Sequence, residues 1–145
     1  MKMSNKDYGE YIKSKSPNSP IWSNMLKAFV VGGIICCIGQ AFTDGYKEWL
    51  KLGPDDAATA ASITLVFIGT LLTGLSLYER IAKFAGAGTL VPITGFANSV
   101  AAPALEFKSE GFVTGMAAKM FVIAGPVIVF GISASVIYGV ILVLI

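Results

Sequence analysis

The chain has 145 residues, of which 54% are hydrophobic and only 14% are charged, with a formal net charge of +2. Soluble domains usually carry about 25% charged residues, so this composition excludes an ordinary soluble globule and a disordered chain. It predicts a small integral membrane protein with one domain. Histidine is absent, which removes the commonest general base and most zinc sites. We therefore expect neither an enzyme nor a bound metal or cofactor, and the small net charge gives no indication of nucleic-acid binding.

Residues 1–20 form a polar N-terminal arm. Lysines outnumber acids in this arm, and its end is rich in serine and proline, a composition that favours a flexible or extended segment. The polar part is long, and no small-residue cleavage site follows the next apolar run, so it does not resemble a secretory signal. We expect residues 21–145 to form a single membrane domain.

The first predicted membrane span covers residues 25–43. No charge occurs over 28–43, which is about 24 Å of helix, and Lys27 can extend its stem toward the interface to lengthen the span. Cys36 and Cys37 are adjacent within it. We expect them to be small buried hydrophobes, since no spacing for a metal site is present.

A polar loop over residues 44–56 separates this span from the second, predicted over 57–78. The loop has more acids than lysines, the second span is uncharged, and the segment 79–83 that follows is net basic. Positive charge concentrates on the cytoplasmic side of membrane proteins. The N-terminus is therefore predicted to be cytoplasmic and the 44–56 loop to lie outside. Glu79 and Lys83 stand at helical i,i+4 spacing, which predicts a local ion pair.

Residues 84–124 are predicted to be discontinuous. The stretch 84–105 is uncharged and long enough to span, yet glycine and proline interrupt it. Residues 112–145 would make a helix of about 51 Å, longer than a bilayer core, so we predict a half-length helix over 112–124 and a last span over 127–145. The predicted helix breaks are at Gly86, Gly88, Pro92, Pro103, Gly125 and Pro126.

Broken backbone cannot face lipid, because its free N–H and C=O groups need protein or water as partners. The discontinuous region is therefore where we expect the function to lie. Two topologies stay open: a re-entrant hairpin leaves the C-terminus outside, whereas a full crossing by 84–105 returns it to the inside.

The predicted fold class is an all-α integral membrane protein with about three full transmembrane helices and a Gly/Pro-broken, hairpin-like pair of half-helices. A short echo links the two broken stretches, Ile93–Ala97 against Val113–Ala117. Duplicated broken segments occur in transporters, and chance similarity is the alternative explanation.

Four stretches carry a resemblance to a known family. They are VGGIICCIGQ (31–40), LLTGLSLYERIAKFAGAG (71–88), VPITGFANSVAAPALEFKSEG (91–111) and GPVIVFG (125–131). They resemble the SpoVA family of endospore-forming bacteria, over nearly the whole chain from about Lys27 onward. The AE-type subunits of that family share the first and third patterns, whereas the polar N-terminal arm is more similar to the AC type.

The resemblance implies a subunit of a complex in the spore inner membrane that moves dipicolinic acid, largely as its calcium chelate. Movement would be into the forespore during sporulation and out during germination. The implied partners are a SpoVAE-type membrane subunit and a cytosolic SpoVAD-type subunit that binds dipicolinate. A tension-gated channel for small solutes and a non-conducting scaffold for the other subunits are the alternatives.

Dipicolinate is a planar aromatic dianion, so a path for it needs clearance, hydroxyl and amide donors, and positive potential. Helix N-termini directed at an interior supply such potential. We therefore predict a substrate path at Thr94, Gly95, Asn98, Ser99, Thr114 and Lys119. At the cytoplasmic mouth, Arg80 and Lys83 would gather anions.

These residues also have structural explanations. Hydrogen bonds between helices would account for the hydroxyl groups, and a helix cap would account for Asn98. Lys119 can pair with Glu106 or Glu110 instead of a solute, and basic side chains at a membrane surface often serve only as anchors.

Overall fold

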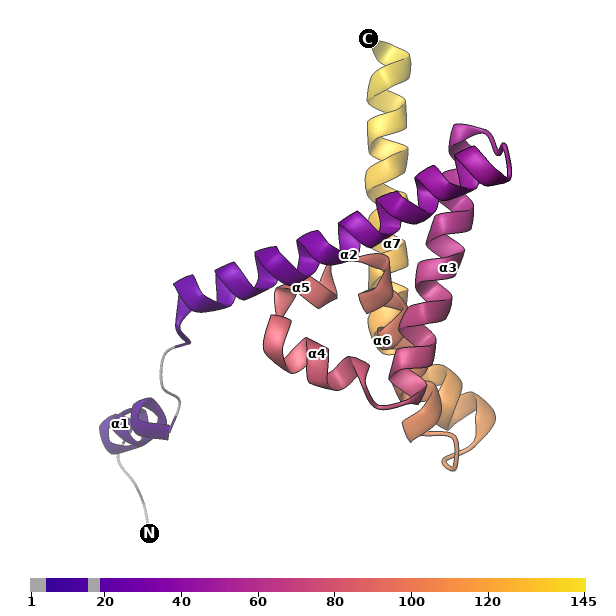
Figure 1. The fold of residues 1–145 in the computed structure, drawn as a ribbon. Coiled ribbons are helices and arrows are strands. Elements are labelled where there is room, and N and C mark those ends of the chain that lie inside the picture. The colour runs from indigo at the N-terminus through magenta and orange to yellow at the C-terminus, as the bar shows by residue number, and fades with distance from the viewer. Residues whose placement is uncertain (1–4, 16–18) are drawn as a thin grey trace.

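The computed structural model describes residues 5–15 and 19–145, and in those ranges the chain is helical without any strand (Figure 1). This confirms the all-α fold class. The elements are α1 (Asn5–Lys15), α2 (Ile21–Trp49), α3 (Pro54–Gly74), α4 (Tyr78–Ala85), α5 (Ala87–Leu90), α6 (Ile93–Glu106), the π-helical turn η1 (Phe112–Ala117) and α7 (Ala118–Leu144). The polar arm contains helix α1, whereas most of its serine- and proline-rich end, predicted to be flexible or extended, lies outside the described residues, which leave out 1–4 and 16–18.

Three helical stretches are long and apolar enough to cross a membrane, in agreement with the predicted number. They are Ile21–Trp49 with 29 residues, Pro54–Gly74 with 21 and Phe112–Leu144 with 33. At about 1.5 Å per residue the last of these is about 50 Å long. A helix of that length fits a hydrocarbon core of about 30 Å only if it tilts or extends beyond the core.

Helix α2 continues through part of the predicted polar loop, so the loop prediction is wrong over residues 44–49. Polar side chains on this last part of the helix find partners without breaking it. The Gln40 amide donates to Asp44 Oδ1 over 2.8 Å within the helix, and the Tyr46 and Thr64 hydroxyl oxygens lie 2.6 Å apart between α2 and α3. The helix therefore extends as a polar end beyond its uncharged stretch.

Helix α3 ends at Gly74 rather than at Tyr78, the predicted end of the span. Ser76 adopts a left-handed conformation with φ 57°, and the Leu77 N–H donates to the Leu72 carbonyl over 2.9 Å. This hydrogen-bond pattern caps the last carbonyls of a helix and turns the chain away from the helix axis. Tyr78 consequently begins a new helix instead of finishing the old one.

The segment from α4 to α6 folds back between the long helices, and α6 then runs in the same direction as α3. The register shows this: Gly69 of α3 lies against Thr94, and one turn later Thr73 is hydrogen-bonded to Asn98. As a result the turns 75–77 and 107–111 both lie toward the end of the bundle away from the C-terminus (Figure 1). We call residues 78–106 the fold-back segment.

Two of the predicted helix breaks are confirmed. Gly86, with φ 54° and ψ −121°, separates α4 from α5, and a residue with a Cβ atom is strained in that conformation. Pro92 is extended and directly precedes α6. Together these two residues produce the change of direction in the fold-back segment.

The other predicted breaks are wrong, because Gly88 lies inside α5, Pro103 inside α6, and Gly125 and Pro126 inside α7. The predicted half-helix over 112–124 is therefore the continuous start of the last long helix. A proline in a helix removes one backbone donor. In apolar surroundings a full break would leave several more groups unpaired, so the helix continues through it.

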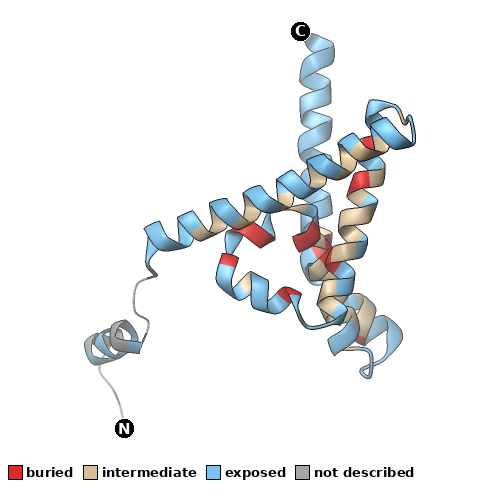
Figure 2. Ribbon diagram, viewed as in Figure 1, coloured by how far each residue is buried: buried red, intermediate tan, exposed pale blue. Residues whose placement is uncertain are grey.

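The buried residues are mostly small (Figure 2). Alanines dominate the buried apolar residues in the described part of the chain, and the buried polar residues are Thr89 and Thr94. The large apolar side chains lie outside, as expected where lipid is the solvent and small residues let helices approach closely. Cys36 and Cys37 are free and exposed, so the prediction of burial is wrong for both.

The second half of α7 differs from the rest because it has no neighbour. Every residue from 126 to 145 is exposed, and Figure 2 shows this part of the helix in one colour. The first half of α7 packs on α6, where Ala124 is buried.

Candidate functional site

A buried tyrosine at the start of the fold-back segment contacts the junction of α5 and α6. The Tyr78 hydroxyl donates to the Thr89 carbonyl oxygen over 2.8 Å, and its oxygen lies 3.2 Å from Thr94 Oγ1. Tyr78, Thr89 and Thr94 are only 4%, 1% and 6% exposed. A buried tyrosine needs a partner for its hydroxyl, and here the partners come from the end of α5 and the start of α6.

A second polar contact joins α3 to α6 beside this tyrosine. Thr73 Oγ1 lies 2.9 Å from Asn98 Oδ1 and 2.7 Å from the Gly69 carbonyl oxygen. We refer to Thr73, Tyr78, Thr89, Thr94 and Asn98 as the hydroxyl cluster. Among the described residues, no buried side-chain nitrogen or oxygen lacks a hydrogen-bond partner.

Glycines hold the fold-back segment close to the long helices. A Cβ atom on Gly88 would come within 2.8 Å of the Ala28 Cα in α2, and one on Gly69 would lie 3.1 Å from the Thr94 carbonyl oxygen. At Gly95 the nearby backbone is that of the preceding turn, with the Leu90 oxygen 2.7 Å from such an atom. The segment is therefore held between α2 and α3 by contacts that leave no room for a methyl group.

An apolar cavity of about 230 Å³ lies between α2, α3 and the cluster. Aliphatic side chains of the two long helices, among them Ile34 and Ile68, line most of it. Tyr78, Thr89 and Thr94 complete the lining. The lining beside the cluster is thus almost entirely apolar.

The structure brings three of the predicted path residues together. Thr94 and Asn98 belong to the hydroxyl cluster, and Gly95 is buried between them in α6. Ser99 follows on the same helix, but its hydroxyl donates to the Phe96 carbonyl over 2.8 Å within α6.

Thr114 and Lys119 lie elsewhere, exposed on η1 and the first turn of α7. The Lys119 ammonium is 5.0 Å from the centre of the Phe107 ring, a cation–π distance. Glu79–Lys83 is the ion pair found among the described residues, so the pairing of Lys119 with Glu106 or Glu110 does not occur there.

Lys83 and Glu79 form the predicted ion pair, with 2.6 Å between Nζ and Oε1. The hydrogen bond and the charge of Lys83 lower the pKa of the Glu79 carboxyl below its usual value. The pair is exposed, so it contributes little to stability. Arg80 is exposed on the same short helix.

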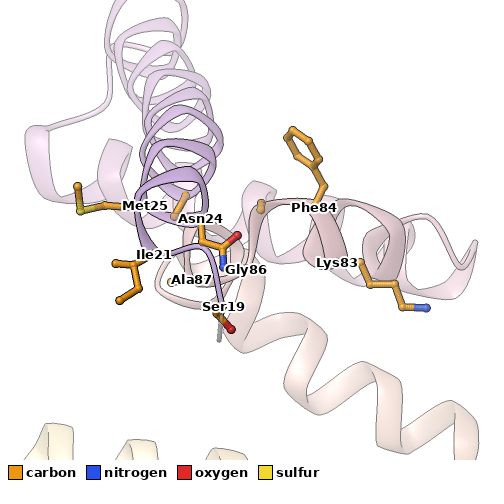
Figure 3. Close-up of a pocket in the computed structure, with 10 residues that line it drawn as sticks. Ser19, Ile21, Asn24, Met25, Lys83, Phe84, Gly86 and Ala87 are labelled. Carbon is orange, nitrogen blue, oxygen red and sulfur yellow. The ribbon is translucent and has the colours of Figure 1, made fainter. Parts of the chain in front are cut away.

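A cleft of about 520 Å³ lies between the start of α2 and the turn at Gly86 (Figure 3). Lys83 is one of its lining residues, but its ammonium group extends away from the turn, whereas the Asn24 amide lies close to Gly86. On the neighbouring surface the Lys27 ammonium is 5.2 Å from the centre of the Phe84 ring. The role of Arg80 and Lys83 as a cytoplasmic mouth stays a prediction, and in this arrangement the Lys83 ammonium is not directed into the cleft.

The echo between Ile93–Ala97 and Val113–Ala117 has a structural counterpart. Each stretch begins a helical element after a residue with non-helical backbone, Pro92 in one case and Gly111 in the other. In each the glycine is buried against the backbone of the preceding turn. The shared Thr-Gly pattern thus marks a helix start folded tightly onto the chain before it.

Sequence reasoning missed Thr73, Tyr78 and Thr89. Tyr78 was assigned to the end of a span because no charge precedes it, and the end of α3 at Gly74 was not foreseen. The available signal was a hydroxyl-bearing aromatic residue next to a broken, threonine-containing segment, since such a hydroxyl must be paired when buried.

The fold and the cluster define a class: an all-helical membrane protein with three long apolar helices and a broken segment folded back between them. Residues 24–141 match the family model of the SpoVAC/SpoVAEB sporulation membrane proteins, and the chain belongs to this family. It is 48% identical over 135 residues to Stage V sporulation protein AC of Bacillus subtilis (strain 168), which covers 93% of this chain and 90% of that protein. No solved structure matches the chain significantly.

Proposed function

We propose that the chain is a membrane subunit of the SpoVA complex that moves dipicolinic acid, as its calcium chelate, across the spore inner membrane. The observation that carries this proposal is the fold-back segment, whose hydroxyl cluster lies between two membrane helices. Tyr78, Thr89 and Thr94 are buried there, and the other two members are half-buried. Broken backbone and paired hydroxyls at such a place are typical of solute pathways in transporters. An ordinary anchor helix needs neither.

The start of α6 fits an anionic solute. Pro92 ends the extended link, and the first N–H groups of α6, at Ile93 and Thr94, precede the first intrahelical donors. Their partial positive charge, with the hydroxyl of Thr94 and the amide of Asn98, would interact with carboxylates. Thr114 and Lys119 would act nearer the turn 107–111, and Arg80 would gather anions on the side of α4.

The proposal includes the membrane orientation and the partners. With the N-terminus cytoplasmic, the turns 75–77 and 107–111 would be cytoplasmic too, and the C-terminus would lie on the opposite side. The exposed second half of α7 would contact lipid and a SpoVAE-type subunit. A SpoVAD-type subunit would deliver or receive dipicolinate at the cytoplasmic turns.

A non-conducting scaffold is the second candidate, and one observation favours it. The hydroxyl groups of the cluster are bonded to one another, to the Asn98 amide oxygen and to backbone, as a packing role requires. In a scaffold these bonds and the close glycine contacts would serve packing only.

Reconstitution in vesicles loaded with calcium dipicolinate tests the proposal, with released dipicolinate detected by terbium luminescence. The chain is measured alone, with an AE-type subunit and with both partners. We expect flux that requires this chain and falls when Thr94 is replaced by valine, while Thr59→Val, on the exposed start of α3, leaves it unchanged. Assembly of the complex without dependence of flux on Thr94 would favour the scaffold. Equal flux of an unrelated small solute under membrane tension would favour a general tension-gated channel.

A further inference from the structure

We propose that Tyr78 is a positioning residue, whose hydroxyl holds the start of α6 in place and restrains solute movement past it. This inference rests on the proposed function and specifies one side chain that controls it. Its hydroxyl links the start of α4 to the end of α5 and to the start of α6. Breaking its hydrogen bonds is therefore expected to release the loop.

The course of the chain gives the hydroxyl this role. The segment leaves α3, runs away in α4, turns back at Gly86 through α5, and returns to Tyr78 at the junction of α5 and α6 (Figure 1). The Thr89 carbonyl oxygen that accepts the hydrogen bond from the Tyr78 hydroxyl also lies beside Gly95, where a Cβ atom would clash with it. The Tyr78 bond thus fixes the backbone of Thr89 and, through it, the first turn of α6.

Once the hydroxyl is removed, α5 keeps the close packing of Gly88 on Ala28 of α2, but the Thr89 side chain and the tip of the segment add little that would hold the start of α6. Thr89 Oγ1 bonds only to Gly86 within the loop, over 3.0 Å, and the exposed tip of the segment has Leu90 at 74% and Val91 at 87% exposure. On the other side of Tyr78 lies the apolar cavity of about 230 Å³. The ring and the start of α6 therefore have space into which they can shift.

Tyr78→Phe is the direct test, because it keeps the ring and removes only the oxygen. Tyr46→Phe is the matched control: its hydroxyl bonds to Thr64 over 2.6 Å, also between two helices, but outside the fold-back segment. Both variants lose a tyrosine hydrogen bond, so a general loss of stability would affect them alike. Thr94→Val removes one of the two Tyr78 contacts and provides an intermediate case for hydrogen exchange only, because it also removes a hydroxyl from the proposed path.

The first measurement is amide hydrogen exchange in lipid nanodiscs, which needs no solute. In Tyr78→Phe we expect exchange over residues 87–96 to rise roughly tenfold, in line with the loss of a buried hydrogen bond, with a smaller rise in Thr94→Val. Tyr46→Phe should leave this segment unchanged. Unchanged exchange over 87–96 in Tyr78→Phe, with the protein folded, would overturn the proposal.

The second measurement is dipicolinate flux in vesicles containing this chain and its partners. Tyr78→Phe should conduct several-fold faster than the natural chain, and Tyr46→Phe at the natural rate. Faster exchange without any change in flux, where the natural chain conducts, would show that Tyr78 is merely structural and would overturn the positioning role. If no combination conducts, the proposed function fails, and the exchange measurement alone decides whether Tyr78 holds the loop.

Discussion

The fold-back region and the second half of α7 use small residues in opposite ways. Where the fold-back segment packs, a methyl group on Gly88 of α5 or on Gly69 of α3 would meet the backbone of a neighbouring helix. In α7 nothing lies within 4 Å of such a group on Gly131 or Gly139. The first region therefore packs against helices of its own chain, apart from its exposed tip at Leu90 and Val91. The second presents apolar surface on every side and requires lipid or another subunit around it.

Polar groups follow the same division. The oxygens of the hydroxyl cluster are paired, and each of its residues is buried or half-buried. The polar side chains in the second half of α7 are Ser133, Ser135 and Tyr138, and all three residues are exposed. Stability and specific conformation are thus concentrated between α2 and α6. The second half of α7 contributes membrane insertion and surface.

The largest expected effect concerns the side of the membrane on which each turn lies. In a background with both native cysteines replaced by alanine, single cysteines at Arg80, Lys108 and Asp55 are labelled with a membrane-impermeant maleimide. Because α3 and α6 run parallel, Arg80→Cys and Lys108→Cys should react from the same side and Asp55→Cys from the other, nearly all or none. Labelling of Lys108→Cys together with Asp55→Cys would show that the segment crosses the membrane completely.

The second prediction compares one methyl group at two glycines. Gly88→Ala places a carbon against the Ala28 backbone, and forcing an atom into such a contact costs about 1–3 kcal/mol. Gly131→Ala enters open space in a helix, so it should be neutral or stabilising by up to about 1 kcal/mol. Thermal unfolding in detergent, followed by the loss of helical circular dichroism, measures both. Equal melting temperatures would show that α5 does not depend on its contact with α2.

The long apolar helices could be predicted from the sequence because lipid requires uncharged stretches of that length. Features that depend on tertiary contacts could be predicted only in part. Uncharged length sufficed to find three long helices, and positions such as Gly86 and Pro92 were correctly predicted as breaks. The low helix propensity of proline predicts a break at Pro126, but α7 continues through it. The cost of unpaired backbone groups in an apolar medium outweighs that propensity.

The candidate site was predictable only in part, for a related reason. Thr94 and Asn98 were identified because they begin a helix after a proline. Tyr78 and Thr73 join them only through the parallel register of α3 and α6, which no local pattern encodes. The turn at Ser76 is the decisive step, since its left-handed backbone ends α3 early and starts the fold-back segment at Tyr78.

The third prediction measures how strongly α3 holds α6. Thr73→Val and Asn98→Leu are made singly and together, and the coupling between them should be about 0.6 kcal/mol, the usual value for a hydrogen bond between membrane helices. A double-mutant cycle on unfolding free energy gives this number. The pair Thr59→Val and Ser62→Ala is the control, since both hydroxyls bond only to their own helix. Strictly additive effects at Thr73 and Asn98 would show that the register depends on the glycine contact instead.

The smallest expected effect on stability is at the base of α7, where Lys119 lies over Phe107. An exposed cation–π contact contributes about 0.5–1 kcal/mol, so Lys119→Ala and Phe107→Leu should lower stability equally and slightly. A solute role separates the two variants: Lys119→Ala should reduce dipicolinate accumulation in spores at an unchanged protein level, because only it removes a positive charge. Phe107→Leu keeps that charge and should accumulate normally. Equal accumulation in both variants would show that Lys119 serves only its contact with the Phe107 ring. The proposed path would then end at the hydroxyl cluster and would not extend to the turn 107–111.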